Sequence, residues 1–421
     1  MEANMSERDR EILRRLAVRR REIAENPENK ARQDAWYRHD AGTGGRPMVL
    51  AEVGGVINEV MPAARVCECA DEWARSVEMR LRVDLYQFDT LKDDHVVEPE
   101  FDVFWKVTPG TYGVESVQHR PADTGGRMGA RRWDPPIRDL DADFGKLRRR
   151  VRSVDRAGTL AEKERAEKVF GDILPVRVKG SFFWSLGMTN VAIDLIGLEQ
   201  LMLAMYDNPS GLHRLMAFLR DDYLAYTEWL EKEGLFTLNN GNDYLGSGSI
   251  GYSRSLPQQD RRPGMPVLSK DLWVLLESQE TVGVGPDLFE EFIFPCQAAI
   301  ARRYGKIYYG CCEPVHSRWD VLKKISNLER VSISPWADEA FMAEALGERY
   351  VYSRKPAPSL ISTGIFDEAA VRADIRRTLD IAKDCRVELI MKDVHTLNNE
   401  PERLPRWVAV AREEIGRARG G

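Results

Sequence analysis

Short apolar runs alternate with amphipathic stretches of helical spacing from about residue 170 to the end of the chain. Each run has the length of one buried strand, and each stretch between two runs is long enough for a crossover helix. Strands and helices in this order predict parallel strands that are buried on both faces. The runs are residues 175–180, 236–238, 272–276, 306–309, 330–333, 350–352 and 387–391. The alternation therefore indicates an α/β fold.

These seven runs are one strand short of a closed (β/α)8 TIM barrel, which is the fold that we expect for residues 171–421. A strand from the first half of the chain, around residues 104–107, would complete the barrel. An open doubly wound sheet is the structural alternative. A dinucleotide-binding protein is disfavoured, because no glycine-rich phosphate-binding motif follows the first run.

Residues 1–170 are irregular and dense in charge, and we expect them to form a mostly helical or irregular extension that caps or flanks the barrel. A helix is predicted over residues 6–24, where Ser6 can cap the N-terminus. The apolar residues on one side of this helix are Ile12, Leu13, Leu16 and Ile23.

The charge balance argues against a nucleic-acid-binding protein. Lys and Arg number 61 and Asp and Glu number 67, which gives a net charge of −6, whereas phosphate backbones need a concentrated basic face. No stretch approaches the roughly 20 apolar residues that cross a bilayer. Residues 1–29 also lack the apolar core of a signal peptide, so we expect a cytoplasmic protein without a membrane partner. Its six cysteines are then free thiols or metal ligands rather than disulfides.

Reactive groups of parallel barrels lie where strands end and loops begin, so the polar residues after each predicted strand are the candidates. Residues 306–309 are followed by Gly310, Cys311, Cys312 and Glu313, with His316 nearby. Adjacent cysteines in an extended segment point to opposite faces, so we expect only one thiol to face the barrel axis. That thiolate could bind Zn²⁺. The alternative is two buried thiols that pack as small apolar side chains.

Two further strand ends carry candidate groups. Asp393 and His395 follow residues 387–391, and the histidine suits a ligand or an acid–base group. Glu277 follows residues 272–276 and could complete a metal site or act as a base. A hydrogen-bonded structural histidine and a solvated loop carboxylate are the respective alternatives.

The loop after residues 236–238 is rich in amides and acids, which suits hydrogen bonding to a polar substrate. It contains Asn240, Asn242, Asp243 and Tyr244, although such a composition is also typical of a simple turn. After residues 330–333, Trp336 could wall a pocket, and Asp338 suits a helix N-cap better than a catalyst.

Three segments resemble the uroporphyrinogen decarboxylase superfamily in their order and spacing, over roughly residues 170–415. They are residues 205–209 (MYDNP), residues 285–292 (GPDLFEEF) followed by Pro295, and residues 394–397 (VHTL) leading to 401–404 (PERL). The resemblance implies a (β/α)8 barrel over residues 171–421 and one of two activities. These are cofactor-free decarboxylation of a porphyrinogen and methyl transfer linked to a corrinoid.

The decarboxylase branch needs arginines that clamp the carboxylates of a porphyrinogen. Residues 47–55 contain no arginine, and residues 175–180 offer only Arg177. The chain therefore resembles the corrinoid-linked methyltransferase branch more closely. In that branch, zinc is held by a His-x-Cys pair on one strand and by a cysteine on a late strand.

By order along the chain, Cys311 or Cys312 corresponds to the pair and His395 to the late ligand. Tyr309 and Gly310 stand where the paired histidine is expected, and a histidine replaces the late cysteine. With Glu277 as a third ligand, the resemblance implies a mixed zinc site that suits an oxygen or nitrogen donor.

The resulting prediction is a zinc-dependent methyltransferase that moves a methyl group from a small O- or N-methylated compound to the corrinoid of a partner protein. The corrinoid would come from the partner because the chain has no Asp-x-His-x-x-Gly motif. The predicted metal ligands are Cys311, Cys312, His395 and Glu277. The predicted catalytic residues are Asp243, Asp393 and Glu313, and the predicted substrate-binding residues are Asn240, Asn242, Tyr244, Trp336 and His316.

Two alternatives stay open at this point. One is a metal-free decarboxylase or lyase of the same fold, in which Asp243 or Asp393 carries the proton. The other is a non-catalytic barrel that binds a small molecule. A homodimer is a further expectation, because homodimers are the commonest oligomers.

Overall fold

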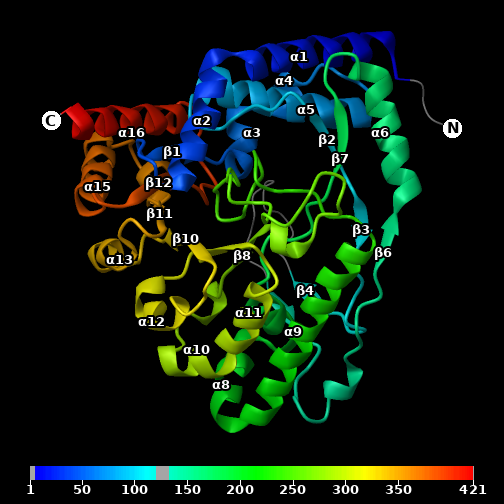
Figure 1. Cartoon of the computed structure of the whole chain (residues 1–421), viewed down its shortest axis with the longest axis vertical. Helices are drawn as coiled ribbons and strands as arrows, with labels where there is room; N and C mark the ends of the chain where they lie inside the picture. Colours follow the sequence, from blue (N-terminus) through cyan, green and yellow to red (C-terminus); the bar gives the residue numbers. More distant parts are fainter. Residues whose placement is uncertain (1–4, 120–131, 421) are drawn as a thin grey trace.

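The computed structural model describes residues 5–119 and 132–420, and its centre is a parallel sheet (Figure 1). Six strands of the described chain form this sheet, and every neighbouring pair is parallel. In spatial order they are β1 (Met48–Ala51), β12 (Arg386–Met391), β11 (Val351–Arg354), β10 (Leu328–Ile333), β9 (Lys306–Tyr309) and β8 (Trp273–Leu276). The predicted α/β class with parallel strands is confirmed.

The predicted closure into an eight-stranded barrel is not found, because the hydrogen-bonded sheet of the described residues ends at β1 and β8. The run 175–180 forms β7 (Val176–Lys179), but β7 pairs with β2 (Phe101–Phe104) in a separate two-stranded sheet. The run 236–238 forms no strand, and Gly180 N donates to the Thr237 hydroxyl instead of to a backbone carbonyl.

The strand expected around residues 104–107 does not join the main sheet either. This segment is divided between β2 and β3 (Lys106–Thr108), and β3 pairs antiparallel with β6 (Ser153–Asp155). A further hairpin-like pair consists of β4 (Val117–His119) and β5 (Arg132–Asp134). The sixth strand of the main sheet is instead β1, which lies beside the last strand, β12.

Helices cover the sheet and extend from it on several sides (Figure 1). In the first half of the chain they are α1 (Glu7–Glu25), α2 (Pro27–Ala41), α3 (Ile57–Val60), α4 (Ala63–Val66), α5 (Glu72–Tyr86), α6 (Arg156–Phe170), α7 (Thr189–Ile196) and α8 (Leu198–Asp207). The others are α9 (Pro209–Lys232), α10 (Pro286–Phe292), α11 (Phe294–Ala301), α12 (Trp319–Leu322), α13 (Glu339–Leu346), α14 (Ser359–Ser362), α15 (Glu368–Ile381) and α16 (Arg403–Gly420). None of the helices in the described part of the chain combines the length and the apolar character needed to cross a membrane.

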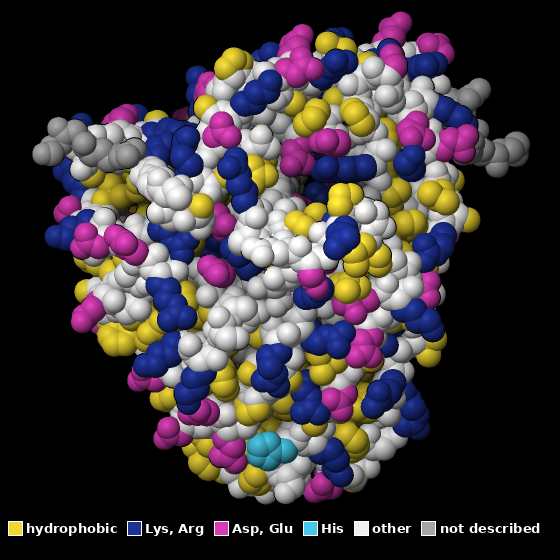
Figure 2. Space-filling model, in the orientation of Figure 1, with side chains coloured by type: hydrophobic (Ala, Val, Ile, Leu, Met, Phe, Trp, Pro, Cys, Tyr) yellow, Lys and Arg dark blue, Asp and Glu magenta, His cyan; other side chains and the backbone are white. Residues whose placement is uncertain are grey.

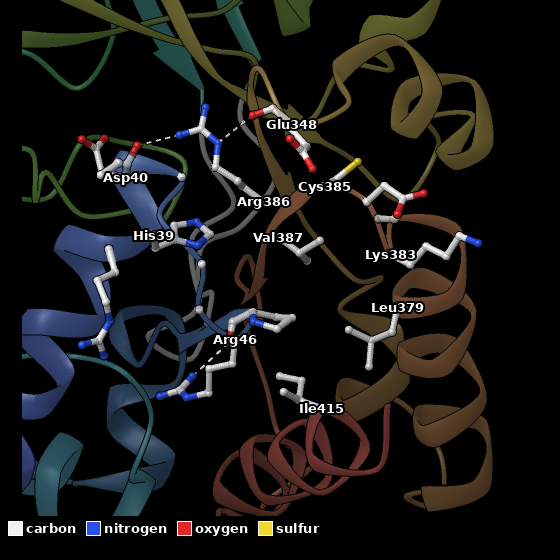
Figure 3. A pocket seen from close by; sticks show the side chains of 18 of the residues that line it. His39, Asp40, Arg46, Glu348, Leu379, Lys383, Cys385, Arg386, Val387 and Ile415 are labelled. Atoms are coloured by element: carbon white, nitrogen blue, oxygen red, sulfur yellow. Dashed lines mark hydrogen bonds between the residues drawn. The ribbon is translucent and has the colours of Figure 1, made fainter. Parts of the chain in front are cut away.

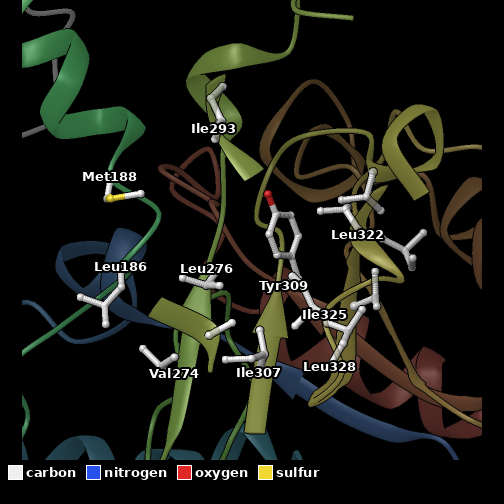
Figure 4. Close-up of a cluster of buried hydrophobic side chains, with 14 of the residues drawn as sticks. Leu186, Met188, Val274, Leu276, Ile293, Ile307, Tyr309, Leu322, Ile325 and Leu328 are labelled. Carbon is white, nitrogen blue, oxygen red and sulfur yellow. The ribbon is translucent and has the colours of Figure 1, made fainter. Parts of the chain in front are cut away.

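The main core lies between the sheet and the helices that follow its strands. Alternate residues of β8 and β9 enter it, namely Val274, Leu276, Ile307 and Tyr309 (Figure 4). The intervening residues Trp273, Leu275 and Tyr308 belong to a second buried cluster on the other face. This two-residue period is what a strand buried on both faces requires.

The first 170 residues build a core of their own and also contribute to the main sheet. Helix α1 begins at the predicted cap, where the Ser6 hydroxyl accepts a hydrogen bond from Asp9 N at 3.1 Å. The predicted apolar side of α1 is buried: Ile12, Leu13 and Leu16 pack with α5, α6 and β2, and Ile23 lies in a small cluster beside them. Because β1 pairs with β12, this half of the chain does not lie apart from the sheet.

Candidate functional site

The carboxyl ends of β9 and β12 bring two thiols, a lysine and an aspartate together. Gly310 follows β9 with φ of 95°, a conformation that favours glycine, and a Cβ there would lie 3.1 Å from Val315 and 3.3 Å from Ser332. Directly after this turn, the sulfurs of Cys311 and Cys312 lie 3.6 Å apart. The prediction that the two thiols point to opposite faces is therefore wrong.

Both sulfurs contact residues that follow β12. Lys392 Nζ lies 3.5 Å from Cys311 Sγ and 3.4 Å from Asp393 Oδ2, and the Cys312 thiol donates to the same Asp393 oxygen at 3.6 Å. We call these four residues the thiol–lysine cluster. Contact with the Cys312 sulfur, together with the Lys392 ammonium, lowers the pKa of the Cys311 thiol. Burial alone would lower the pKa of Lys392, but Cys311, Asp393 and Glu52 raise it above its ordinary value.

The four predicted zinc ligands do not gather in this cluster. Glu277 accepts hydrogen bonds from the Ser185 hydroxyl at 3.1 Å and from Gln279 N at 3.0 Å. Burial, with the nearby charges of Glu280 and Glu313, raises the pKa of Glu277 well above its usual value. The ring of His395 lies against Gly55, where a Cβ would come within 3.4 Å of Nδ1.

Across residues 5–119 and 132–420, no three His, Cys, Asp or Glu side chains are arranged to hold a metal ion. The Lys392 ammonium already contacts Cys311 and Asp393, which supplies positive charge at this point. The predicted ligand set therefore does not fit a zinc ion.

Two other predicted residues have structural partners. The buried carboxylate of Glu313 accepts from Ser278 N at 2.8 Å and from Cys311 N at 2.9 Å, so it ties the end of β8 to the end of β9. His316 Nδ1 accepts from Asp338 N at 3.1 Å. Asp338 caps α13 as predicted, because its carboxylate accepts from Phe341 N at 3.0 Å.

A cavity of about 300 Å³ opens between β7, the loop after α9 and β8. Three predicted residues line it, namely Asn242, Asp243 and Tyr244. Its aromatic walls include Phe104, Trp184 and Tyr244, whose side chains stay 43%, 41% and 56% exposed. Trp336 and His316 do not line this cavity, and Trp336 is 67% exposed on the surface.

A buried ion pair forms the polar wall of the cavity. Lys179 Nζ, at the end of β7, lies 2.6 Å from Asp243 Oδ1 and 3.5 Å from Asp102 Oδ2. Burial raises the pKa of Asp243, while Lys179 opposes this shift. The Asn242 amide donates to Val96 O at 2.6 Å, and its buried Oδ1 has no hydrogen-bond partner within the described chain.

Asn240, predicted to bind substrate, has a different role. Its amide donates to Leu256 O at 2.7 Å and to Ser253 O at 3.4 Å, which holds the following loop in place. It is absent from the residues that line the cavity.

Tyr244 connects the cavity to the thiol–lysine cluster. Its hydroxyl donates to Glu52 Oε1 at 2.9 Å, and Glu52 directly follows β1. At Gly248 (φ of 87°), a Cβ would lie 3.1 Å from Glu52 Oε1 and 3.7 Å from Lys392 Cδ. Glu52 and Lys392 therefore both lie beside Gly248, which places Tyr244 near the thiol–lysine cluster.

Sequence reasoning missed Lys179, Asp102, Glu52 and Lys392. Lys179 lies near the end of the predicted strand 175–180. Lys392 directly precedes Asp393, which the sequence predicts to be catalytic. Their positions at strand ends were an available signal, because that is where a parallel sheet collects its reactive groups.

A larger hollow of about 720 Å³ lies at the opposite edge of the sheet, where β12 and β1 begin (Figure 3). Arg386 crosses it and donates to Asp40 O at 2.6 Å and to Glu348 O at 3.1 Å. These bonds tie the end of α2 to the strand, which is a structural role. On the face shown in Figure 2, cationic and anionic side chains are interspersed without a continuous basic patch.

Comparisons with known proteins assign no family. No family model matches the chain, and no curated protein matches it. Among solved structures, a methyltransferase from Methanosarcina mazei is similar, with a TM-score of 0.49 and 11% sequence identity. The similarity covers 91% of this chain and 98% of that one. Similarity at this level establishes neither a family nor an activity for this chain.

Proposed function

We propose that this chain is a methyltransferase of the uroporphyrinogen decarboxylase superfamily, which takes a methyl group from a small O- or N-methylated compound. The observation that carries the proposal is the buried Lys179–Asp243 ion pair, 2.6 Å long, on the wall of an aromatic-lined cavity. The order of the segments at 205–209, 285–292 and 394–404 adds support from the sequence.

Loss of a methyl group leaves negative charge on an oxygen, or a lone pair on a nitrogen. A positioned proton donor beside that atom stabilises the charge as it develops. Lys179 and Asp243 share a short hydrogen-bonded contact from which a proton can pass to the leaving atom. Burial raises the pKa of the Asp243 carboxyl group and the Lys179 ammonium opposes this shift, so the two groups compete for one proton.

The remaining lining residues would position the substrate. The rings of Phe104 and Trp184 offer apolar faces, and the Lys179–Asp243 pair supplies the polar groups. An apolar wall with a few placed polar atoms is what orients a small ligand. The methyl group would pass to a corrinoid carried by a partner protein, as the sequence resemblance implies.

No step of this proposal uses zinc, because the predicted ligands do not fit one ion. Elemental analysis of the purified protein tests that point directly. We expect far less than one zinc per chain, and one tightly bound zinc that is lost on changing Cys311 and Cys312 to Ser would contradict it.

The activity test incubates the purified chain with free reduced cobalamin and a panel of methyl ethers and methylated amines. Methylcobalamin, followed by its absorbance, should form with one class of donor and should fall at least about 10²-fold in Asp243→Asn, the usual scale for a lost acid–base group. Formation at an unchanged rate in this variant would refute the assigned role.

A metal-free decarboxylase is the second candidate, and the same ion pair favours it. An ammonium can hold a carboxylate, and a neighbouring carboxylic acid can protonate the carbanion left after loss of carbon dioxide. The two functions separate cleanly: carbon dioxide release from a carboxylate substrate, with no methylcobalamin from any donor, would establish the decarboxylase and reject the methyltransferase.

A further inference from the structure

Cys311 and Cys312 are neighbours in the chain and also in space. Their sulfurs lie 3.6 Å apart, which is van der Waals contact. In a regular extended segment they would point to opposite faces. Cys311 is 3% exposed and Cys312 is half-buried, so the pair is reached from the side of Cys312.

The surroundings of the pair favour oxidation of one thiol followed by attack of the other. The Lys392 ammonium, 3.5 Å from Cys311 Sγ, stabilises an anionic sulfur, which is the form that attacks a peroxide. A resolving thiol in contact with the oxidised sulfur then closes a disulfide before further oxidation.

We propose that Cys311 and Cys312 are a redox modification site, which hydrogen peroxide converts into a disulfide between adjacent residues. In the first step, the Cys311 sulfur attacks the peroxide, its O–O bond breaks, and Cys311 becomes a sulfenic acid while one water is released. In the second step, the Cys312 sulfur attacks that sulfenic sulfur and a second water leaves. Together the two thiols lose two hydrogens and two electrons, and one peroxide becomes two waters.

The other described cysteines lack this combination of a partner sulfur and a cation. Cys385 donates to Ala343 O at 3.4 Å, and burial raises the pKa of its thiol to about 11. Burial and Glu78 raise the pKa of Cys69 to about 12. These thiols serve as internal references for the reactivity of the pair. The inference does not depend on the proposed methyl transfer.

The test treats the folded full-length chain with a small excess of hydrogen peroxide and maps it by trypsin digestion and mass spectrometry. Residues 307–318 form one tryptic peptide that contains both thiols, because cleavage follows Lys306 and Arg318. We expect this peptide to lose about 2 Da, the mass of two hydrogens, before the peptides containing Cys69 or Cys385 change.

Single variants separate the two steps. In Cys312→Ser, the sulfenic acid on Cys311 cannot be resolved and should be trapped by dimedone, whereas Cys385→Ser should behave as the unchanged chain. A trivalent arsenical that bridges two sulfurs should protect both thiols from alkylation in the unchanged chain and not in either single variant.

Three results would overturn the proposal. One is a peptide that only gains oxygen atoms without the loss of two hydrogens. Another is oxidation of Cys69 or Cys385 ahead of the pair. The third is disulfide formation that is as fast in the urea-unfolded chain as in the folded chain, since the fold would then contribute nothing to the reaction.

Discussion

Removal of the Lys179 ammonium should destabilise the fold by leaving a buried carboxylate without its partner. In the structure, the side chains of Lys179 and Asp243 are only 10% and 11% exposed, and they lie 2.6 Å apart. Breaking a buried ion pair by removing one partner costs about 3–5 kcal/mol. Lys179→Met preserves the length of the side chain, so lost packing adds little to this figure.

The size of the effect depends on pH in a definite direction. Burial raises the pKa of Asp243 in the folded chain, so this carboxyl contributes less stability as the pH rises through its folded-state pKa. Without Lys179 that pKa rises further. The destabilisation is therefore largest above the folded-state pKa, and it disappears below about pH 4, where both folded and unfolded chains carry the proton.

The assay is urea unfolding of the unchanged chain, Lys179→Met, and the double variant Lys179→Met with Asp243→Asn, at about pH 8 and about pH 5.5. The single variant should lose the most stability at the higher pH. The double variant should recover most of the loss, because it no longer buries an unpaired charge. A single variant within about 0.5 kcal/mol of the unchanged chain at the higher pH would refute the reasoning.

Three further changes probe the elements that position the site. Gly310→Ala places a Cβ at φ of 95° against Val315, and urea unfolding should show a loss of about 1–2 kcal/mol. Unchanged stability would show that this turn tolerates a side chain. Glu313→Gln turns one of two carboxylate acceptors into a donor that faces a backbone N–H, and thermal unfolding should show a loss of about 1–3 kcal/mol. Ser6→Ala removes the N-cap of α1 and should cost about 1 kcal/mol, whereas the exposed residue Glu7→Gln is a control that keeps the cap. Equal stability of Ser6→Ala and its control would show that the cap adds nothing.

Local patterns were sufficient to predict several elements of this protein. The Ser6 cap and the buried side of α1 can be predicted from the helical spacing of residues 6–24. The strands β8 to β12 can be predicted from short apolar segments that lie between turn signals. The loop with Asn242, Asp243 and Tyr244 was located by its own amide- and acid-rich composition, although residues 236–238 before it form no strand. All of these properties depend on residues within a few positions of one another.

Pairings between distant residues could be decided only by the tertiary structure. No local pattern predicts that β1 lies beside β12, that β7 leaves the main sheet to pair with β2, or that Lys179 meets Asp243. The same is true of the contact between the sulfurs of Cys311 and Cys312, which an extended segment would separate. The physical reason is that a sequence period records which face of an element is buried, whereas the choice of partner depends on how all elements pack at once.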